Sequence, residues 1–420
     1  MPALLLAGRT GRQWEWAGPL WGNRDFQLLW SGQTLSVLGS QASALAFPLL
    51  VLELTQSPAR AGVVGFVAGL PVLLCQLPAG ALVDRWNRKT VMIGCDVGRL
   101  LVIASVPVLG WLVGFSYPQL VVTAFLHASL SVVFVLAERA ALPHVVDAPS
   151  LPVAVAQNQA RMQGATMAGP PLGGALYGIS RVFPFAVDAV SYLVSLLTLV
   201  LIRTPLQDPP QAPRLPLHRE VAEGLQFVWA DRCLRVLSAF SAALTLLRTG
   251  FPLALIVLAR HLGATPGLIG VILGVSGVGG LLGALLAPRL IRTIPAGWLN
   301  IVGTWTWGVL IALLALVPST LALAPITAGI ALVGPVLAVV AQTRRARLIP
   351  RHLLGRVHSV SLVISGSTAP LGSLLTGFLL AWLGAPATLA VLGSGLLITA
   401  ATATASPTLR HADLPTVPAT

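Results

Sequence analysis

The chain has 420 residues, of which 55% are hydrophobic and 9% are charged, and its mean hydropathy is +0.85. Soluble domains carry roughly 25% charged residues, so this composition excludes a soluble globular protein and predicts one that crosses a membrane many times. The net charge of +13 does not indicate nucleic-acid binding, because the basic residues form short groups between apolar segments rather than one basic face.

The chain begins with MPALLLAGRT, whose apolar run is short and follows no basic stretch. We therefore expect residues 1–22 to be a cytoplasmic tail rather than a signal peptide. Apolar runs of about the 20 residues that a bilayer requires follow. They predict twelve spanning helices, at 26–53, 61–83, 90–113, 118–138, 156–178, 183–202, 234–259, 267–287, 298–317, 320–342, 358–381 and 384–404.

A polar, proline-rich stretch near the middle of the chain divides these spans into two sets of equal number. We expect an N-terminal bundle at 23–203, a cytoplasmic linker at 204–230, a C-terminal bundle at 231–405 and a cytoplasmic tail at 406–420. The fold class predicted is an all-α membrane protein of two six-helix bundles.

The basic residues predict the orientation of the chain. All but six of the 26 fall in the tails or in loops on the side of the N-terminus. Positive charge accumulates on the cytoplasmic side of membrane proteins, so both termini are predicted to be cytoplasmic. The six exceptions are three at predicted outer ends and three within predicted spans: Arg60, Arg181 and Arg260, and Arg99, Arg161 and Arg248.

The two halves of the chain resemble each other at an offset of about 200 residues. FPLLVL at 47–52 matches FPLALI at 251–256, GALVDRWNRK at 80–89 matches GALLAPRLIR at 283–292, and PLGGALYG at 171–178 matches PLGSLLTG at 370–377. Parallel repeats of this kind are typical of transporters whose binding site lies at mid-membrane between the halves. A duplicated scaffold without transport activity is the structural alternative.

Two motifs resemble a known family. The loop between the second and third predicted helices reads Gly80-x-x-x-Asp84-Arg85-x-x-Arg88-Lys89, and the fifth predicted helix contains GPPLGG. Together with NRDFQLLWSGQTLSVLGS at the start of the first helix, they resemble the major facilitator superfamily, in particular the bacterial efflux branch that includes the enterobactin exporter and macrolide efflux proteins. Family loops usually have a glycine where this chain has Asn87, which also tolerates a left-handed turn.

The resemblance implies a monomeric transporter in the bacterial plasma membrane that exports small amphipathic molecules, such as drugs, antibiotics or siderophores. It implies alternating access and proton antiport, with no cofactor and no metal. An importer of the same fold remains an alternative. The chain has no H-E-x-x-H, G-x-S-x-G or G-x-x-x-x-G-K-[ST] motif, so we expect neither an enzyme nor a nucleotide-driven pump.

The resemblance also implies that the charged loop is a cytoplasmic latch between the halves. Gly80 would allow close helix packing, Asp84 would face a helix N-terminus of the other half, and the basic residues would pair with nearby acids. A topology anchor is the simpler alternative, and Asp96 with Arg99 could be a self-neutralising pair. The predicted latch comprises Gly80, Asp84, Arg85, Arg88, Lys89, Asp96, Arg99 and Glu138.

The GPPLGG motif carries two interpretations. A kink with tight helix packing is the structural one, and a seal or hinge beside the transport pathway is the one that the resemblance implies. The residues concerned are Gly169, Pro170, Gly173 and Gly174.

Polar residues near the middle of a membrane are costly and so indicate function. His127 and Arg248 fall near the midplane of the fourth and seventh predicted helices, which line the cavity in the family. Arg248 would bind an anionic or carbonyl group and His127 would bind a proton. Each has a structural alternative, as hydrogen-bonded packing groups. Gln41 and Gln163 would add hydrogen bonds to a substrate.

The acidic residues give weaker indications. Glu53 and Asp188 fall near predicted outer helix ends, where they could be outer-gate or proton sites, although contact with interfacial water is the simpler interpretation. No carboxylate is placed at the midplane, so proton antiport is expected from the resemblance alone.

Overall fold

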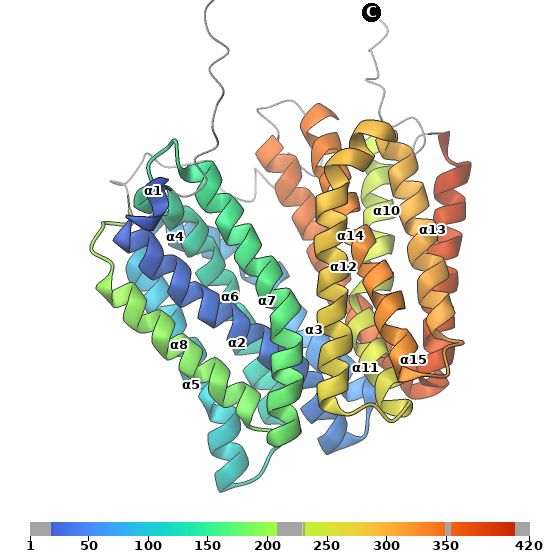
Figure 1. Ribbon diagram of the computed structural model, residues 1–420, viewed down its shortest axis with the longest axis horizontal. Coiled ribbons are helices and arrows are strands. Elements are labelled where there is room, and N and C mark those ends of the chain that lie inside the picture. The colour runs from blue at the N-terminus through green and yellow to red at the C-terminus, as the bar shows by residue number, and fades with distance from the viewer. Residues whose placement is uncertain (1–17, 208–228, 230–231, 349–353, 408–420) are drawn as a thin grey trace, which may run out of the picture.

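The structure is a computed structural model that describes residues 18–207, 229, 232–348 and 354–407 (Figure 1). Every regular element within these ranges is an α-helix, as predicted. The helices are α1 (Gly18–Trp21), α2 (Arg24–Thr55), α3 (Pro58–Leu74), α4 (Gln76–Arg85), α5 (Arg88–Leu112), α6 (Tyr117–Val145), α7 (Leu151–Ile179), α8 (Phe183–Leu201), α10 (Arg232–Thr249), α11 (Phe251–His261), α12 (Pro266–Thr293), α13 (Ala296–Leu314), α14 (Thr320–Leu348) and α15 (Leu354–Ala405).

Each predicted span overlaps one helix, a pair of consecutive helices or one part of α15. Within the described residues, nine helical segments are long and apolar enough to cross a membrane, and α3 is a shorter apolar helix. The segment Gly366–Ala405 counts once, although Gly384 interrupts it with φ 76° and ψ 174°. The chain is thus a multi-pass helical membrane protein, and the exact number of twelve spans stays a prediction.

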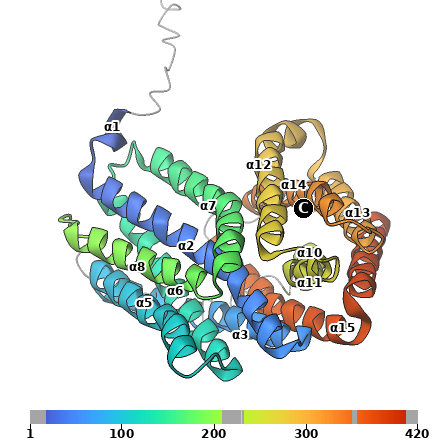
Figure 2. The same ribbon diagram turned by 60° about the horizontal axis from the view of Figure 1, so that its bottom comes forward.

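Two groups of helices lie side by side (Figures 1 and 2). One contains α2 to α8 and the other contains α10 to α15. They pack against each other through α7 with α12 and through α3 with α15. Most of the linker predicted at 204–230 and most of both predicted tails lie outside the described residues.

The two ends of the molecule differ in charge. We call the end that carries Arg85, Arg88, Lys89, Arg289 and Arg292 the basic end, which is at the top of Figure 1. The opposite end carries the turns between α2 and α3, between α7 and α8 and between α11 and α12. The two groups of helices approach each other most closely at this opposite end (Figure 1).

Short polar caps begin the helices at the opposite end. Ser57, Ser116 and Thr265 each accept a hydrogen bond from the backbone N–H three residues later. A proline follows each cap within the first two helical positions, where its missing N–H costs nothing. These caps explain why long apolar stretches turn sharply at these points.

The seventh predicted span is two helices rather than one. Helix α10 ends at Thr249, and α11 begins at Phe251, with Gly250 between them. Gly250 packs against Gly372 and Thr376 of α15, where a side chain would collide. Pro252 lacks the N–H that a continuous helix would use. The break places the backbone of Gly250 next to the space between the two groups of helices.

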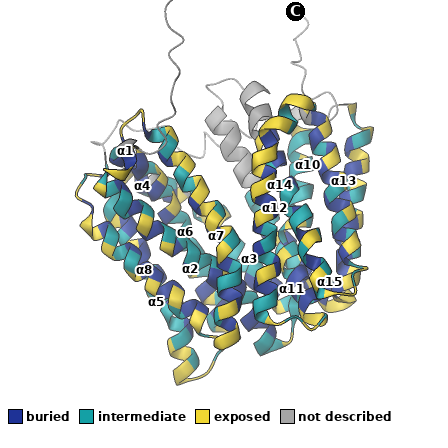
Figure 3. Ribbon diagram, viewed as in Figure 1, coloured by how far each residue is buried: buried dark blue, intermediate teal, exposed yellow. Residues whose placement is uncertain are grey.

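Outward faces of the helices are apolar and exposed (Figure 3). Trp111, Leu316 and Trp382 are among the most exposed, at 85%, 79% and 80%. In a membrane protein these side chains face lipid, and tryptophan is enriched near the membrane surface. All three lie near helix ends at the opposite end of the molecule.

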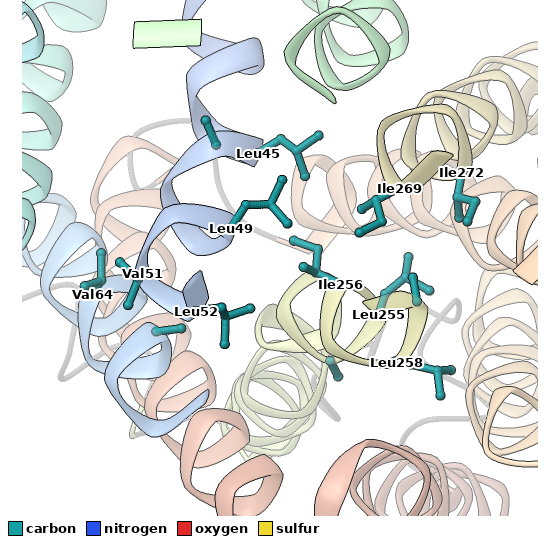
Figure 4. Close-up of a cluster of buried hydrophobic side chains, with 14 of the residues drawn as sticks. Leu45, Leu49, Val51, Leu52, Val64, Leu255, Ile256, Leu258, Ile269 and Ile272 are labelled. Carbon is teal, nitrogen blue, oxygen red and sulfur yellow. The ribbon is translucent and has the colours of Figure 1, made fainter. Parts of the chain in front are cut away.

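A cluster of buried apolar side chains joins the two groups of helices at the opposite end (Figure 4). Leu45 and Leu49 of α2 lie across from Ile256 of α11 and Ile269 of α12, and all four are at most 4% exposed. Because these residues come from both halves of the chain, the cluster closes this end of the interface.

Candidate functional site

A cavity of about 530 Å³ lies between the two groups of helices. Its lining comes from α2, α3, α6 and α7 on one side and from α10, α11, α12 and α15 on the other. Cavities of this size bind drug-sized ligands. Most lining residues are apolar, and His127 is the sole titratable side chain among those assigned to the cavity wall.

The few polar groups of the wall are small and mostly neutral. Gln41 donates a hydrogen bond to the Thr166 hydroxyl at 3.0 Å. Thr249 and Gly250 bring the break between α10 and α11 to the wall, and Ser276 adds a hydroxyl from α12. The wall therefore offers hydrogen bonds without a fixed charge.

The histidine of the cavity wall connects to a buried polar cluster. His127 Nε2 lies 2.6 Å from the Tyr192 hydroxyl, which lies 2.8 Å from Ser40 Oγ. Ser40 Oγ lies 3.4 Å from Asp188 Oδ1, and Ser43 Oγ donates to Asp188 Oδ2 at 2.5 Å. Asp188 is fully buried, so the interpretation of this residue as an interfacial, water-exposed acid was wrong.

A second polar group lies deeper in the same bundle. Asp96 and Arg99 form a buried ion pair, and Ser195 donates to Asp96 at 2.6 Å. The Arg99 guanidinium also lies over the rings of Phe134 and Tyr192, 3.9 and 4.6 Å from their centres. This geometry is the self-neutralising pair that the sequence left open, and a part in a latch stays a prediction.

The basic residues of the charged loop bind backbone carbonyls rather than acids. Arg88 donates to the carbonyl groups of Ala140 and Leu206 at 3.1 and 3.2 Å. Lys89 donates to those of Val200 and Ile202 at 3.1 and 2.6 Å. Lys89 thus caps the C-terminal end of α8, where helix carbonyls lack partners and the dipole favours a cation. Arg88 joins the last turns of α6 to the segment that follows α8.

The acids expected as partners are engaged elsewhere. Glu138 pairs with Arg161 at 2.6 Å, and both are largely buried. Arg85 is exposed and forms no ion pair with a described acid. The side chain of Asp84 lies outside the described residues. Within the described part of the chain, the loop therefore contacts its own bundle.

Two residues of the loop can be compared with expectation. The space within 4 Å of a Cβ at Gly80 is empty of described atoms, so this glycine makes no close helix contact in this conformation, and its part in a latch stays a prediction. Asn87 has φ −61° and is the N-cap of α5, where its side chain accepts from the N–H groups of Lys89 and Thr90. Asn87 therefore caps a helix and does not form a left-handed turn.

The GPPLGG motif faces two neighbours at once. Gly169 and Gly173 lie against Gln41 and Ala42 of α2, within the same bundle. Gly174 lies against the backbone of Gly270 in α12, in the other half. A side chain on any of these glycines would collide with backbone or with a packed side chain.

Pro170 extends the same contact between the halves. Its carbonyl oxygen approaches the Cα side of Gly270, and Pro171 packs against Gly274. The motif therefore forms the N-terminal half's side of the α7–α12 contact. Tight packing is what the structure shows, and a role as seal or hinge stays a prediction.

The repeat seen in the sequence reappears in these contacts. Gly173 of α7 packs on Ala42 of α2, and Gly372 of α15 packs on Leu246 of α10. Both members of the second pair lie about 200 residues after their counterparts. On the other side of the cavity, Gly377 of α15 meets Gly62 of α3. The interface between α3 and α15 thus resembles the one between α7 and α12, because in each a glycine of one half packs directly against a glycine of the other.

Two of the predicted substrate residues lie away from the cavity wall. The Arg248 guanidinium lies over the ring of Trp307 in α13, 4.8 Å from its centre. Gln163 donates to the Gly277 carbonyl at 3.5 Å, in the contact between α7 and α12. His127 and Gln41, by contrast, line the cavity as expected.

A smaller cavity of about 330 Å³ lies near the opposite end. Glu53 there accepts a hydrogen bond from Tyr177 and pairs with Arg181, both at 2.6 Å. Arg260 of the other half lines the same cavity. Glu53 is therefore part of a cluster of polar side chains near the opposite end of the molecule rather than an isolated surface acid.

Sequence reasoning named Asp188 as a possible proton site but judged contact with interfacial water to be simpler, and it missed the contacts with serines and Tyr192 that connect Asp188 to His127. A signal was present, because Asp188 and Tyr192 are four residues apart, and Ser40 and Ser43 are three apart. Residues at these spacings share one face of a helix. Two polar faces on otherwise apolar helices indicate that the helices pack with these faces together.

Comparison with known proteins gives a family for the whole chain. A family model described as transmembrane secretion effector matches residues 16–417. The multidrug efflux pump Tap of Mycobacterium tuberculosis is 29% identical over 395 residues, which cover 90% of this chain and 93% of Tap. Macrolide efflux protein A of Streptococcus pyogenes is 25% identical over 48% of this chain and 50% of its own length.

Solved transporter structures share the fold. A bacterial homologue of the lysosomal transporter Spinster, in an inward-facing conformation, superposes with a TM-score of 0.70 at 17% sequence identity. The match covers 94% of this chain and 97% of that one. At this identity the likeness concerns the fold alone.

Proposed function

This chain belongs to the transmembrane secretion effector family of the major facilitator superfamily, and from that premise we propose that it exports drug-like, amphipathic organic molecules. Family membership makes it a membrane transporter of small molecules and not an enzyme. Relatives that are called multidrug and macrolide efflux proteins support drugs and antibiotics as the substrate class, with siderophores as a second one.

The observation that carries this proposal is the apolar cavity of about 530 Å³ between the two halves. The described residues of its wall carry no fixed charge, and their polar groups are few and small. Such a surface binds by apolar contact, which discriminates weakly between molecules of similar size. We therefore expect several chemically different substrates that share an apolar body and a polar group.

Charge and packing support an orientation in the membrane and a conformation. We take the basic end as cytoplasmic, since positive loops stay inside. The apolar cluster around Leu49 and Ile256 then closes the outer end, and the halves separate toward the cytoplasm. This conformation suits the loading step of an exporter. An importer is the alternative, because the same conformation suits the release step of import.

Alternating access requires a second conformation, in which the cytoplasmic side closes. We propose that the charged loop then exchanges some of its contacts within the bundle for contacts with the other half. Arg85 is free to do so, because it is exposed and unpaired with any described acid. Proton antiport would drive the cycle. The transporting unit would be a monomer, because the described residues on both sides of the cavity belong to one chain.

The test is accumulation of ethidium, tetracycline and erythromycin in efflux-deficient bacteria that express the protein, with and without a protonophore. We expect lower accumulation than in control cells, and loss of the difference when the protonophore is added. Ala44→Trp should abolish the difference, because Ala44 is exposed within the cavity wall. Val190→Trp is the matched control, because Val190 is exposed on α8 and is not part of that wall.

Equal accumulation with and without the protein for every compound would contradict export of drug-like molecules. Lower accumulation that persists with the protonophore would contradict proton coupling but leave export standing. Higher accumulation would favour the importer.

A further inference from the structure

We propose that Asp188 is the site at which this transporter binds and releases its coupling proton, and that Ser40, Tyr192 and His127 connect this site to the cavity. The inference rests on the proposed proton-coupled export and names the residue that performs the coupling.

Asp188 has no counter-ion among the described residues. The ion pairs there engage the other membrane-embedded acids, with Asp96 bound to Arg99, Glu138 to Arg161 and Glu53 to Arg181. Asp188 is fully buried, and within the described residues the hydrogen-bond partners of its carboxyl oxygens are the hydroxyls of Ser40, Ser43 and Ser191. A lone ionised carboxyl is costly in such a place, whereas a neutral acid is not. Among the described membrane-embedded acids, Asp188 is therefore the one best able to exist in the neutral form as well as the ionised form, which a proton carrier requires.

The surrounding groups suit both charge states. Ser43 donates to Asp188 Oδ2 at 2.5 Å, and Ser40 Oγ lies 3.4 Å from Oδ1. A hydroxyl both donates and accepts, so each serine can turn to bind either the carboxylate or the acid. Neither change requires the helices to move apart.

A continuous path connects this carboxyl to the cavity. Ser40, Ser43 and His127 all belong to the cavity wall. The Tyr192 hydroxyl lies 2.6 Å from His127 Nε2 and 2.8 Å from Ser40 Oγ. On release, the O–H bond of the acid breaks, its electron pair stays on the carboxylate oxygen, and the proton passes to Ser40. Ser40 gives its own proton either to water in the cavity or to Tyr192. In the second case the Tyr192 hydroxyl gives its own proton to His127 Nε2, and the protonated imidazole releases a proton from Nδ1 to water in the cavity.

The elements packed around α8 differ in the groups that they bring near Asp188. Helix α5 contributes Asp96 and Arg99, which pair with each other. Helix α6 contributes His127, which contacts Tyr192, and the side chains of α2 that contact Asp188 are the hydroxyls of Ser40 and Ser43. Arg99 lies over the Tyr192 ring, which places a positive charge near the path without neutralising Asp188 directly.

The first test follows the infrared carbonyl band of protonated carboxyl groups during a pH titration of the purified, full-length protein. We expect a titrating band that is absent in Asp188→Asn and present in Asp147→Asn, since Asp147 is exposed in the turn between α6 and α7. A band that is unchanged in Asp188→Asn would overturn the proposal.

A second pair of variants keeps the carboxyl in place, in case Asp188→Asn does not fold. Ser43→Ala removes a donor to Asp188 and should shift the midpoint of the band. Ser195→Ala removes a donor to Asp96 and should leave the midpoint unchanged. Equal midpoints in Ser43→Ala and in the wild type would contradict the assignment to Asp188.

Transport separates this inference from the proposed function. In inverted membrane vesicles with ethidium as the probe, uptake by the wild type should depend on the pH gradient. In Asp188→Asn the rate of this gradient-driven uptake should fall at least about tenfold, while exchange of ethidium across the membrane should be retained. Gradient-driven uptake that is equal in both proteins overturns the role of Asp188 and leaves export standing. Uptake by the wild type that does not depend on the pH gradient would overturn proton coupling, and with it the assignment of Asp188 as the coupling site.

Discussion

Lys89 and Arg88 bind four backbone carbonyls in the N-terminal half of the chain. A topology anchor needs only a positive charge, and a latch needs partners in the other half. The contacts in this conformation are of a third kind, in which both side chains bind carbonyls of their own half and Lys89 caps the end of α8. The motif therefore has a structural task that exists before any latch forms.

This task gives a prediction at the residue scale. Lys89→Met should lower the free energy of unfolding by about 1 kcal/mol, because two carbonyl groups at the end of α8 lose a charged donor. Arg85→Met is the matched control and should leave stability unchanged. The measurement is thermal unfolding of both variants in detergent. A larger loss of stability in Arg85→Met than in Lys89→Met would contradict the capping role.

The residues of the site show what sequence could and could not predict. Position along a predicted helix gives an expected depth in the membrane, and His127, predicted near the midplane, lines the cavity together with Gln41. It does not give the direction in which a side chain points. Arg248 was also predicted near the midplane, but its guanidinium lies over the ring of Trp307. Asp188 was judged from its distance to a helix end, although its neighbours on α2 determine its burial.

Helix α7 shows how one element serves two interfaces. Its glycines at 169 and 173 allow α2 to pack closely, and Gly174 allows the other half to do so. Because the second contact lies toward the closed end, it must separate when that end opens. Small residues allow close approach with little side-chain interlocking, so the contact can form and break.

The matching prediction at the element scale changes one glycine. Gly174→Leu should oppose closure of this end by about 2 kcal/mol, because the new side chain meets the backbone of Pro266 and Gly270. That shift exceeds about tenfold in population. Gly178→Leu is the control on the same helix, since nothing lies within 4 Å of a Cβ there.

Spin-label distances between α7 and α12 measure this effect directly. Gly174→Leu should lengthen the distance at the closed end, and Gly178→Leu should leave it as in the wild type. A wild-type distance distribution in Gly174→Leu would show that the contact tolerates bulk and does not act as a seal.

Sequence predicted the helices well because apolar length is set by the membrane itself. It missed the break at Gly250, and a comparison of the two repeats shows why. Phe47-Pro48 and Phe251-Pro252 occupy equivalent positions, yet α2 runs continuously through the first pair. The second pair follows Gly250, which lies against Thr376 and Gly372. The difference thus depends on contacts with α15 that no local pattern contains.

At the scale of the whole molecule, the internal repeat predicted two similar halves with a site between them. The paired contacts of Gly173 with Ala42 and Gly372 with Leu246 agree with that plan. The conformation was not predictable, because one sequence must encode both the closed and the open form of each end. Charge and hydropathy are the same in both forms.

The most direct test of transport by relative movement of the halves is a reversible cross-link at the contact between α3 and α15, beside the cavity. A Cβ built at Gly65 of α3 lies 3.1 Å from Cβ of Ser373 in α15. Disulfides join Cβ atoms about 3.5–4.5 Å apart, so a small shift allows Gly65→Cys and Ser373→Cys to cross-link. Cys75, Cys95 and Cys233 are first replaced by alanine, and Gly65→Cys alone is the control.

The measurement is ethidium efflux from cells before oxidation, after oxidation and after reduction. We predict that oxidation stops efflux in the double variant, that reduction restores it, and that the single variant responds to neither treatment. Efflux that continues at the same rate in a fully cross-linked protein would contradict export by alternate opening of the two ends.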